Sequence, residues 1–562
     1  MVSVDIPKFG VFKTSRNQLA YEPSDLADLL NTVWGDGSVY GREGSLLNKS
    51  AAQWGSQNIL GGSDFSKTGE SFYYTVVALA DGRLFYISSS NGSFGVSSAT
   101  WTEINSITNT SPALSTSTTV RKFYGFNNKL FIADGTNNLY WWDATSNQLT
   151  DVTLPVALTG NVVGLREKSS SLVVLDDAGR THLSQVNDGT DLTAAGTGFL
   201  NYGRTEGLTA TNIINFGDDL LITTEDKELK KYQTYRLSGI QFYDPLVVGS
   251  DTNKFEVTRL RSFSGIIGAT GQEIGSDTIG LTPRGFIGVQ QAVNSDKLEN
   301  NDYISSPIRE LVEQIDFNRS DLMSSCVDFI KGRYYCAVPL EPASEGCDII
   351  LVYDFQQSRP QEGLQRWSVW SFPFDANIGR IFSWGGQPFM STTDGKIYKL
   401  DDPEANYADD GSAYTVLIKL PLIGGEQKGT QKVFNRLNLN IINISNLRTG
   451  VNGQLPFEIK FQPYSLSGGV EFEKIDLNAF KPIEIQQSNV GIEYDTNATY
   501  DTDYYDGGGN DSRLWTTALA GGSNSALGWI LSTEEAGVNW GLGGLSLEVE
   551  AGNFSDNKST NI

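Results

Sequence analysis

The sequence offers one histidine, His182, to any catalyst that needs an imidazole. A Ser/His/Asp or a Cys/His mechanism would depend on this residue alone. The residues around it, Gly179 to Ser184, read as an alternating strand that follows a turn. We therefore interpret His182 as a structural residue and not as a catalytic base.

The three cysteines, Cys326, Cys336 and Cys347, form no CxxC pair, and their number is odd. An odd count is a poor disulfide framework, and no metal-ligand spacing is present. We expect all three to be small apolar residues within β structure, with a zinc site as the weaker alternative.

An acidic, glycine-rich segment is the one candidate for a metal site. Oxygen ligands at alternate positions can hold calcium. However, Tyr505 stands at the third ligand position of an EF-hand loop, and no glutamate closes the loop. The sequence favours a solvated turn, with a calcium ion at residues 495–511 as the alternative. The carboxylates concerned are Asp495, Asp501, Asp503, Asp506 and Asp511.

Other catalytic patterns have no support. A glycosidase needs two carboxylates facing each other across a cleft, but 66 acidic residues guarantee such pairs by chance. Trp141 and Trp142 lie in an expected strand, and Trp367 and Trp370 follow one, so we expect core packing and not sugar platforms. No Walker, HExxH, GxSxG or Rossmann motif stands in a supporting context. The sequence predicts no enzyme, no cofactor and no catalytic, cofactor-binding or metal residues.

The elements that carry these residues are expected to be short strands. Of 562 residues, 39% are hydrophobic, 11% aromatic and only 19% charged, and 59 are glycine. Many β-strands joined by tight turns require such a composition. It argues against a helical bundle, a coiled coil and wholesale disorder, and the length suits two or three domains.

The net charge of −24 limits the partners. Tight duplex binding needs clustered lysine and arginine, and an acidic surface also disfavours anionic membranes. Such a surface suits a channel that passes nucleic acid without holding it. No apolar run approaches the roughly 20 residues of a membrane span, and the start, MVSVDIPKFGVF, lacks the features of a signal peptide. We expect a soluble chain made in the cytosol.

A strand–turn–strand unit recurs along the chain. If Leu84, Leu130, Leu172 and Leu220 are equivalent, the steps are 46, 42 and 48 residues. These steps match the 40–50 residues of a four-stranded propeller blade. We predict an all-β fold with an irregular β-propeller of six or seven blades, the alternative being a run of unrelated hairpins.

Helix is expected in two places, residues 21–31 and 307–315. The first has a serine cap and early acidic residues, and the second has proline at a plausible first position. The predicted domains are an N-terminal extended arm with one short helix, 1–60, and a propeller, 61–405. An antiparallel β-sandwich, 406–552, and a loose tail, 553–562, follow.

The order of these pieces resembles the tail nozzle, or packaged-DNA stabilization, proteins of short-tailed (podovirus-type) bacteriophages. Residues 31–44, NTVWGDGSVYGREG, resemble the opening of those proteins, with Glu43 where proline is usual. Residues 350–354 with 366–370 resemble a late blade. Residues 394–401, 418–422 and 434–439 resemble the passage from propeller to sandwich.

This resemblance implies a virion tail protein that assembles as a ring, with six copies in known members. It would extend the DNA channel below the portal and adaptor, retain packaged DNA and pass it on ejection. The implied partners are the portal or adaptor, fibre or spike proteins, and double-stranded DNA in transit, without membrane insertion. Two alternatives stay open: another tail component, such as a fibre-attachment hub or receptor-binding tip, and a carbohydrate-binding or carbohydrate-active propeller.

Overall fold

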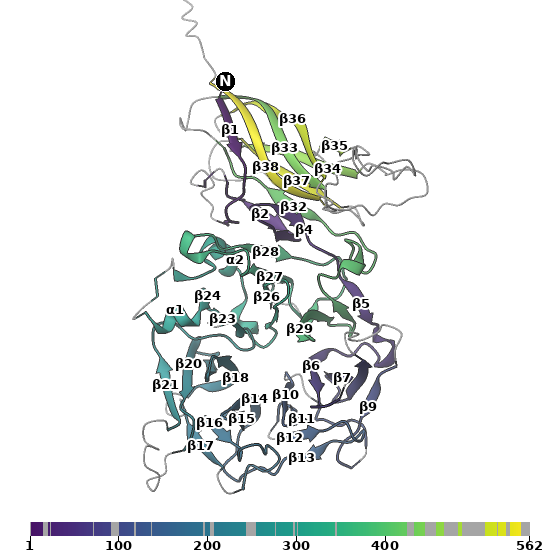
Figure 1. The fold of residues 1–562 in the computed structure, drawn as a ribbon, viewed down its shortest axis with the longest axis vertical. Coiled ribbons are helices and arrows are strands. Elements are labelled where there is room, and N and C mark those ends of the chain that lie inside the picture. The colour runs from purple at the N-terminus through teal and green to yellow at the C-terminus, as the bar shows by residue number, and fades with distance from the viewer. Residues whose placement is uncertain are drawn as a thin grey trace, which may run out of the picture. The chain divides into compact units, whose positions relative to one another are not determined.

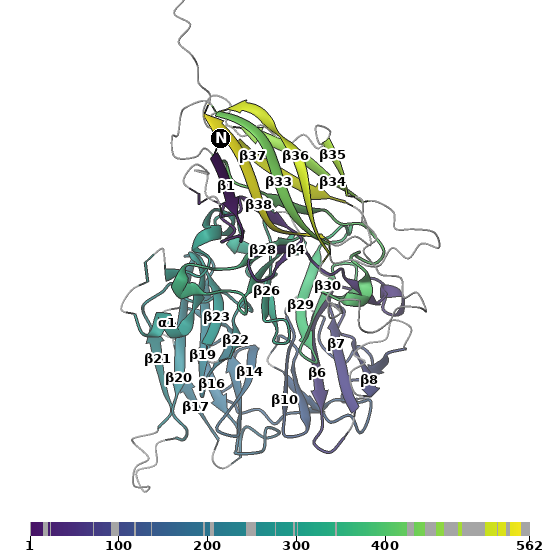
Figure 2. The ribbon, with the colours of Figure 1, turned by 45° about the horizontal axis from the view of Figure 1, so that its top comes forward.

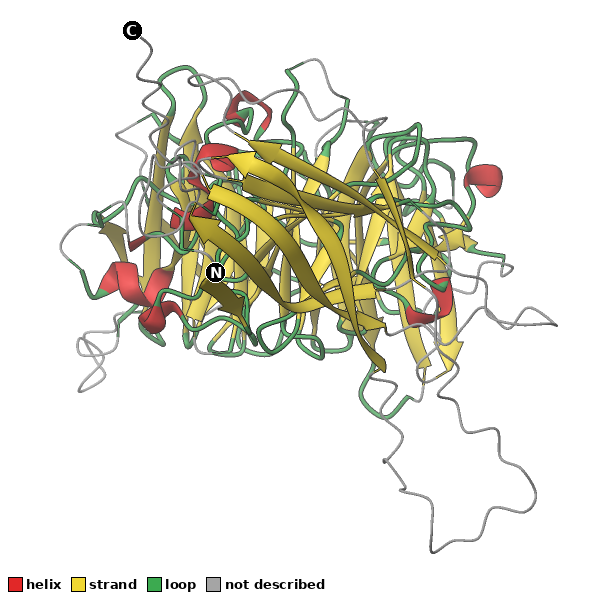
Figure 3. Cartoon of the chain, turned by 90° about the horizontal axis from the view of Figure 1, so that it is seen from above, coloured by secondary structure: helices red, strands yellow, loops and turns green. Residues whose placement is uncertain are grey.

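The computed structural model consists predominantly of strands (Figure 3), most of them paired antiparallel. It divides into two compact units. Unit 1 comprises residues 1–45, 357–373 and 401–562, and unit 2 comprises 46–356 and 374–400. The structure describes residues 2–551 apart from the longer stretches 15–20, 91–99, 203–206, 243–253, 424–431, 444–456, 466–480, 486–511 and 535–539 and the shorter ones 23, 71, 109, 117–119, 137, 195–196, 276, 296–297, 300–301, 343–344 and 525–526.

The described strands of unit 2 form seven antiparallel sheets in chain order. The first two sheets are β6 (Ile59–Ser66), β7 (Phe72–Leu79), β8 (Leu84–Ser90) and β9 (Thr102–Ile104), and then β10 (Lys122–Phe126), β11 (Lys129–Ala133), β12 (Leu139–Trp142) and β13 (Thr150–Asp151). The third and fourth are β14 (Val162–Lys168), β15 (Ser171–Asp176), β16 (Arg180–Leu183) and β17 (Gly198–Asn201), and then β18 (Thr209–Phe216), β19 (Asp219–Asp226), β20 (Lys231–Ser238) and β21 (Glu256–Leu260). The last three are β22 (Gln272–Ile274), β23 (Asp277–Thr282) and β24 (Gly285–Gly288); β25 (Ser324–Asp328), β26 (Arg333–Val338) and β27 (Ile349–Asp354); and β29 (Ile378–Trp384), β30 (Gln387–Thr392) and β31 (Ile397–Lys399) with β5 (Leu46–Lys49).

These sheets close into a ring around a common axis (Figures 1 and 2). The first strand of each sheet contacts the first strand of the next, in the order β6, β10, β14, β18, β22, β25, β29, and β29 contacts β6 again. Hydrophobic clusters fill the spaces between neighbouring sheets, such as the one that joins Phe65 and Val76 to Leu130 and Trp142. The prediction of a β-propeller is therefore confirmed as the fold class.

The last sheet takes its outer strand from the start of unit 2. β5 pairs antiparallel with β31, so that Leu46 lies opposite Lys399. The first and last strands of the ring thus share one sheet. This pairing adds backbone hydrogen bonds to the closure of the ring.

The register shows that the four leucines taken as equivalent do not all occupy the same strand of their sheets, because Leu84 differs from the other three. Leu130, Leu172 and Leu220 each lie at the start of the second strand of their sheet, whereas Leu84 begins a third strand. In the first sheet, Tyr74 of β7 holds the comparable position, opposite Phe65. Asn127-Asn128 precedes β11 and Ser169-Ser170 precedes β15, whereas Asp81-Gly82 precedes β8, so the spacing of the leucines alone does not reveal which strand each one occupies.

Unit 1 contains two mainly antiparallel groups of strands. The first follows the order β3 (Thr32–Trp34), β4 (Val39–Gly41), β38 (Trp540–Ala551), β33 (Lys432–Asn443) and β36 (Ser512–Asn524), with β1 (Val2–Ile6) beside β38. The second follows the order β28 (Trp367–Trp370), β2 (Asp28–Leu30), β32 (Val416–Lys419), β37 (Leu527–Thr533), β34 (Phe457–Ser465) and β35 (Lys481–Ile485). Strands from both ends of the chain therefore share sheets, and residues 357–373, within the predicted propeller range, belong to unit 1.

The helix expected at residues 21–31 was wrong. Asp28–Leu30 is strand β2, which pairs antiparallel with β32. The carboxylate of Asp25 accepts the backbone N–H of Glu22, so it closes a local turn. Leu26 and Leu29 are fully buried in the resulting structure. Sheet pairing has overridden the local helix signals here.

The second expected helix is present in a shorter form. A 3-10 turn, η5 (Ser306–Ile308), leads into α2 (Arg309–Val312), with proline in the first positions as the sequence indicated. The remaining described helical segments are α1 (Val289–Val293), η2 (Ala51–Gln53), η6 (Phe317–Arg319), η7 (Pro360–Glu362) and η8 (Pro403–Ala405).

Candidate functional site

The propeller axis contains a cavity of about 170 Å³ to which every inner strand contributes. Its walls carry four basic side chains and several neutral polar ones, and none of its lining residues is acidic. The basic residues are Arg121, Lys122, Arg166 and Arg380. In a chain with a net charge of −24, this local excess of positive charge marks the cavity as the candidate functional site.

Irregularities in the inner strands help to position these residues. The register shifts near the start of β6, β14, β18 and β29, where one strand has an extra residue relative to its partner. The residue that resumes the pairing is Asn212 in β18 and Arg380 in β29, and both line the cavity. Bulges of this kind redirect side chains, and they are common beside functional sites.

The Lys122 ammonium is strongly perturbed. Burial, together with the nearby Arg166 and Arg380 guanidiniums, lowers its pKa to about 7. Its Nζ donates a hydrogen bond to Asn212 Oδ1 at 3.2 Å, which is a neutral acceptor. The ammonium therefore gains little compensation for two like charges nearby.

The three arginines bind mainly to backbone carbonyl oxygens. Arg166 donates to the carbonyl of Leu165 at 2.8 Å, and Arg380 donates to the carbonyl of Met323 at 3.4 Å. Arg121 donates through Nη2 to the carbonyl of Ser115. Burial lowers the pKa of each guanidinium, although nearby acidic groups oppose this effect.

Arg121 retains unused hydrogen-bonding capacity. Its Nε and Nη1 are buried and have no hydrogen-bond partner among the described residues. A buried donor without an acceptor costs roughly 1–3 kcal/mol, and more when it is charged. The cavity lining carries basic residues and no carboxylate, so what it could hold chemically is an anion.

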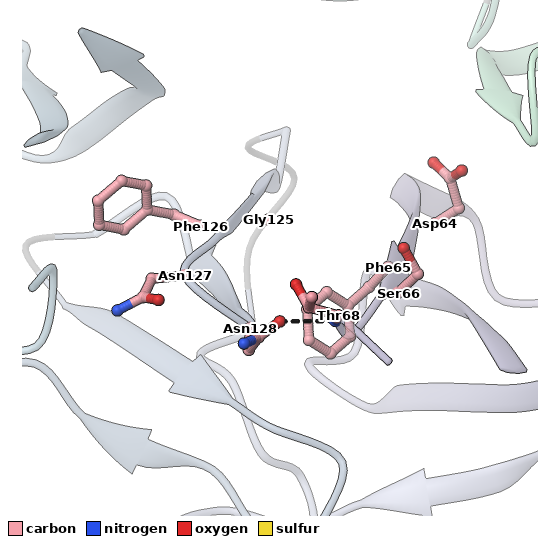
Figure 4. Close-up of a pocket in the computed structure, with 8 residues that line it drawn as sticks. All are labelled: Asp64, Phe65, Ser66, Thr68, Gly125, Phe126, Asn127 and Asn128. Atoms are coloured by element: carbon pink, nitrogen blue, oxygen red, sulfur yellow. Dashed lines mark hydrogen bonds between the residues drawn. The ribbon is translucent and has the colours of Figure 1, made fainter. Parts of the chain in front are cut away.

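A second, larger cavity of about 350 Å³ lies between the turns of the first two sheets (Figure 4). The backbone N–H of Thr68 donates to Asn128 Oδ1 at 2.7 Å across it. Asp64 is its one carboxylate, and that side chain accepts the N–H of Gly385. The lining therefore provides no pair of carboxylates for acid–base catalysis.

The residues singled out in the sequence lie elsewhere. His182 is in β16, 2% exposed, with Nε2 3.2 Å from Asp176 Oδ2. The three cysteines are buried and free, and burial raises the pKa of the Cys336 thiol to about 12. Such thiols are poor nucleophiles.

The other candidates also yield no site. Trp142, Trp367 and Trp370 are buried, as expected for core residues, while Trp141 is partly buried beneath the Lys129 ammonium. The candidate calcium segment, 495–511, lies outside the described residues. Within the described ranges, no cluster of three or more histidine, cysteine, aspartate or glutamate residues is arranged to hold a metal. None of the helices in those ranges is long and apolar enough to cross a membrane.

Sequence reasoning missed the axial cations. Lys122 directly follows Arg121, and Arg166 is followed by Glu167 and Lys168, whereas Arg380 is the one charged residue of its strand. A basic residue in or directly before the first strand of several sheets was the available signal. It gains meaning only once the closed ring brings those strands together.

In unit 1, Arg42 forms a fully buried ion pair with Asp409. The contacts are bidentate, at 2.8 Å from Nη1 and 2.5 Å from Nη2. The guanidinium carbon lies 4.1 Å from the ring centroid of Tyr414 and 5.3 Å from that of Trp370. Burial alone would lower the pKa of Arg42, but Asp409 raises it above its ordinary value.

The closed ring of antiparallel sheets places the chain among the β-propellers. No known family profile matches the chain, and no curated protein sequence matches it. Among solved structures it is similar to BBS1N in complex with ARL6DN, with 14% identity, a TM-score of 0.38, and coverage of 64% of this chain and 97% of that one. It is also similar to YCF48 bound to D1 peptide, with 11% identity, a TM-score of 0.37, and coverage of 66% and 97%. For BamB from Moraxella catarrhalis the identity is 10%, the TM-score 0.33, and the coverage 71% and 98%.

Proposed function

We propose that the chain is a structural protein of the virion, a subunit of the tail nozzle ring of a short-tailed bacteriophage. In this role it extends the DNA channel below the portal or adaptor, retains packaged DNA and passes it on ejection. The function requires broad β surfaces for assembly and no chemistry. The observation that carries the proposal is the convergence, within unit 1, of segments on which the sequence resemblance rests.

These segments come from distant parts of the chain. The Nε1 of Trp34, in the opening motif, donates to the carbonyl of Trp367 at 2.8 Å. The Nε1 of Trp370, in the late-blade motif, donates to the carbonyl of Thr32 at 2.8 Å. Two motifs more than 300 residues apart in sequence thus share one structural core. The contact between the opening motif and the late-blade motif supports the view that both belong to one tail nozzle protein.

The basic residue and the glycine of the opening motif have structural roles in the same region. Arg42 is neutralised by Asp409, which also accepts the backbone N–H of Ser45 at 3.0 Å. A Cβ on Gly44 would lie 1.8 Å from the carbonyl oxygen of Ala408, so glycine is required there. The motif residues therefore secure the junction between the N-terminal strands and the segment that precedes β32.

Electron cryomicroscopy of particles containing the chain tests the proposal. We expect six copies in a ring below the portal, and particles assembled without the chain should lose packaged DNA. An antibody fragment raised against the chain should label the tail close to the capsid. Labelling at fibre tips, or binding of the purified chain to host glycan, would instead favour the receptor-binding or carbohydrate alternatives.

A further inference from the structure

The axial cavity concentrates positive charge without neutralising it. None of its four cations forms an ion pair within 4 Å inside the part of the chain that the structure describes. Asp134 acts on Arg121 at longer range, Glu273 on Arg166, and Asp321 on Arg380. Buried charges are normally paired, because an uncompensated one is costly to desolvate.

The cations approach the cavity from separate sheets. Lys122 belongs to β10, Arg166 to β14 and Arg380 to β29, and Arg121 directly precedes β10. Arg121 and Arg380 are 2% and 5% exposed, so their positions are enforced by packing and not by solvent. Arg121 differs from the other three, because its guanidinium lies near Asp134 and donates to the carbonyl of Ser115.

Neutral polar residues complete the lining, namely Asn212 of β18, Gln272 of β22, and Ser324 and Ser325 of β25. Gln272 Nε2 already donates to the carbonyl of Ser325 at 2.8 Å, and the Ser325 hydroxyl donates to the carbonyl of Ala269 at 2.9 Å. Ser324 Oγ accepts the backbone N–H of Ile381 at 2.9 Å, which leaves its own hydroxyl hydrogen able to donate. Several donors from several directions suit a ligand with acceptor oxygens all around it.

The volume limits the size of that ligand. The cavity of about 170 Å³ is smaller than the roughly 300–1,000 Å³ of pockets that take drug-sized ligands. It therefore suits one small oxyanion with a few waters.

We propose that the axial cavity of the propeller binds one small tetrahedral oxyanion, of the phosphate or sulfate class, between Lys122, Arg166 and Arg380. The anion accepts charge-assisted hydrogen bonds from these cations, each stronger than a bond between neutral groups. It joins β10, β14 and β29 at the axis. The site is independent of the proposed role in the virion and could exist in any propeller with this lining.

Binding at this site should be linked to the protonation of Lys122. The groups that face its ammonium are Arg166 of β14, Arg380 of β29 and Asn212 of β18. Since its pKa is lowered to about 7 without an anion, the side chain is largely neutral at pH 8. An adjacent oxyanion raises that pKa, so binding at pH 8 takes up a proton.

Isothermal titration calorimetry on the full chain tests the proposal with sodium sulfate and with inorganic phosphate, at constant ionic strength maintained with chloride. We expect one saturable site per chain for either oxyanion. Lys122→Gln and Arg166→Gln should each weaken binding at least tenfold. Lys396→Gln and Arg309→Gln remove the same charge at exposed positions, whose side chains are 42% and 56% exposed, and should leave the affinity within about twofold.

Proton linkage gives a second readout. Sulfate does not titrate near neutral pH, so heats measured at pH 8 in buffers of different ionisation enthalpy report proton uptake by the protein. We expect uptake in the wild type and none in Lys122→Gln, with circular dichroism used to check that the variant is folded. An absence of saturable sulfate and phosphate binding, equal affinity in the axial and control variants, or competition by a DNA oligonucleotide in place of the small ions would overturn the proposal.

Discussion

The buried pair of Arg42 and Asp409 shows how much can depend on a single residue type. Both side chains are fully buried, and the carboxylate also accepts from Ser45. Two buried charges are tolerated when each satisfies the other, but a single remaining charge is not. The stability of this region should therefore depend on Asp409 far more than on any exposed acid.

We predict that Asp409→Asn lowers the stability of the chain by about 3–5 kcal/mol, because Arg42 stays buried without a counter-charge. Asp36→Asn is the matched control, since Asp36 pairs with Lys8 at the surface, where the side chains are 86% and 63% exposed. That change should cost less than about 1 kcal/mol. Urea denaturation followed by tryptophan fluorescence compares the two, and equal midpoints would contradict the prediction.

Lys122 should impose a pH dependence on stability in the absence of oxyanions. Its pKa in the folded chain, about 7, is lower than the ordinary value of about 10.4 for lysine. Between these values the unfolded chain holds a proton that the folded chain lacks, so stability rises with pH. Below pH 7 both states are protonated, and the cost of the buried charge is fully present.

We therefore predict that Lys122→Met is more stable than the wild type at pH 7 and that this advantage shrinks toward pH 9. The change cannot exceed about 1.4 kcal/mol per pH unit. Thermal unfolding of both proteins in an oxyanion-free buffer at pH 6, 7, 8 and 9 measures it. Parallel melting temperatures across this range would show that Lys122 is not perturbed.

At the scale of elements, the sequence predicted those features that depend on residues adjacent in the chain. The Asn127-Asn128 turn that joins β10 to β11 has positive φ values of 46° and 60°, which asparagine tolerates better than most residues, so this hairpin could be recognised from sequence. The strand at Asp28–Leu30 could not, because its pairing with β32 depends on residues almost 400 positions away. The axial cluster was hidden for the same reason, since Lys122, Arg166 and Arg380 meet only when the ring closes.

Ring closure by β5 is testable through a cross-link. Leu46 and Lys399 lie opposite each other and are both partly exposed. Opposed residues of antiparallel strands have Cα separations of roughly 4.5–5.5 Å, which suits a disulfide. We predict that the double variant Leu46→Cys, Lys399→Cys forms this bond and gains about 2–4 kcal/mol of stability under oxidising conditions.

The gain should disappear on reduction, and Leu46→Cys alone should show none. The native cysteines interfere little, since all three are buried and free. A disulfide that forms without raising the melting temperature would mean that the ring opens elsewhere first.

At the scale of the whole molecule, charge is the dominant property. Each chain carries −24, so a ring of six would carry −144. Positive charge is sequestered in part at the propeller axis, where Lys122, Arg166 and Arg380 gather. A surface left rich in carboxylates offers passing DNA no charge-assisted hydrogen bonds that would slow it. In the proposed ring, the same surface would make the subunits repel one another.

This repulsion leads to the prediction that ring assembly depends on ionic strength. The Debye length falls from roughly 30 Å at 0.01 M to about 8 Å at 0.15 M, so salt screens most of the repulsion between exposed charges. If subunits associate through apolar and hydrogen-bonded flanks, the oligomeric fraction should rise as salt is added over this range. Analytical ultracentrifugation measures that fraction, and sucrose at matched osmolality serves as the uncharged control. In the assembled ring, acidic side chains should predominate on the wall facing the ring axis. A wall formed mainly by lysine and arginine, or association that weakens steadily with salt, would contradict the role of the acidic surface in DNA passage.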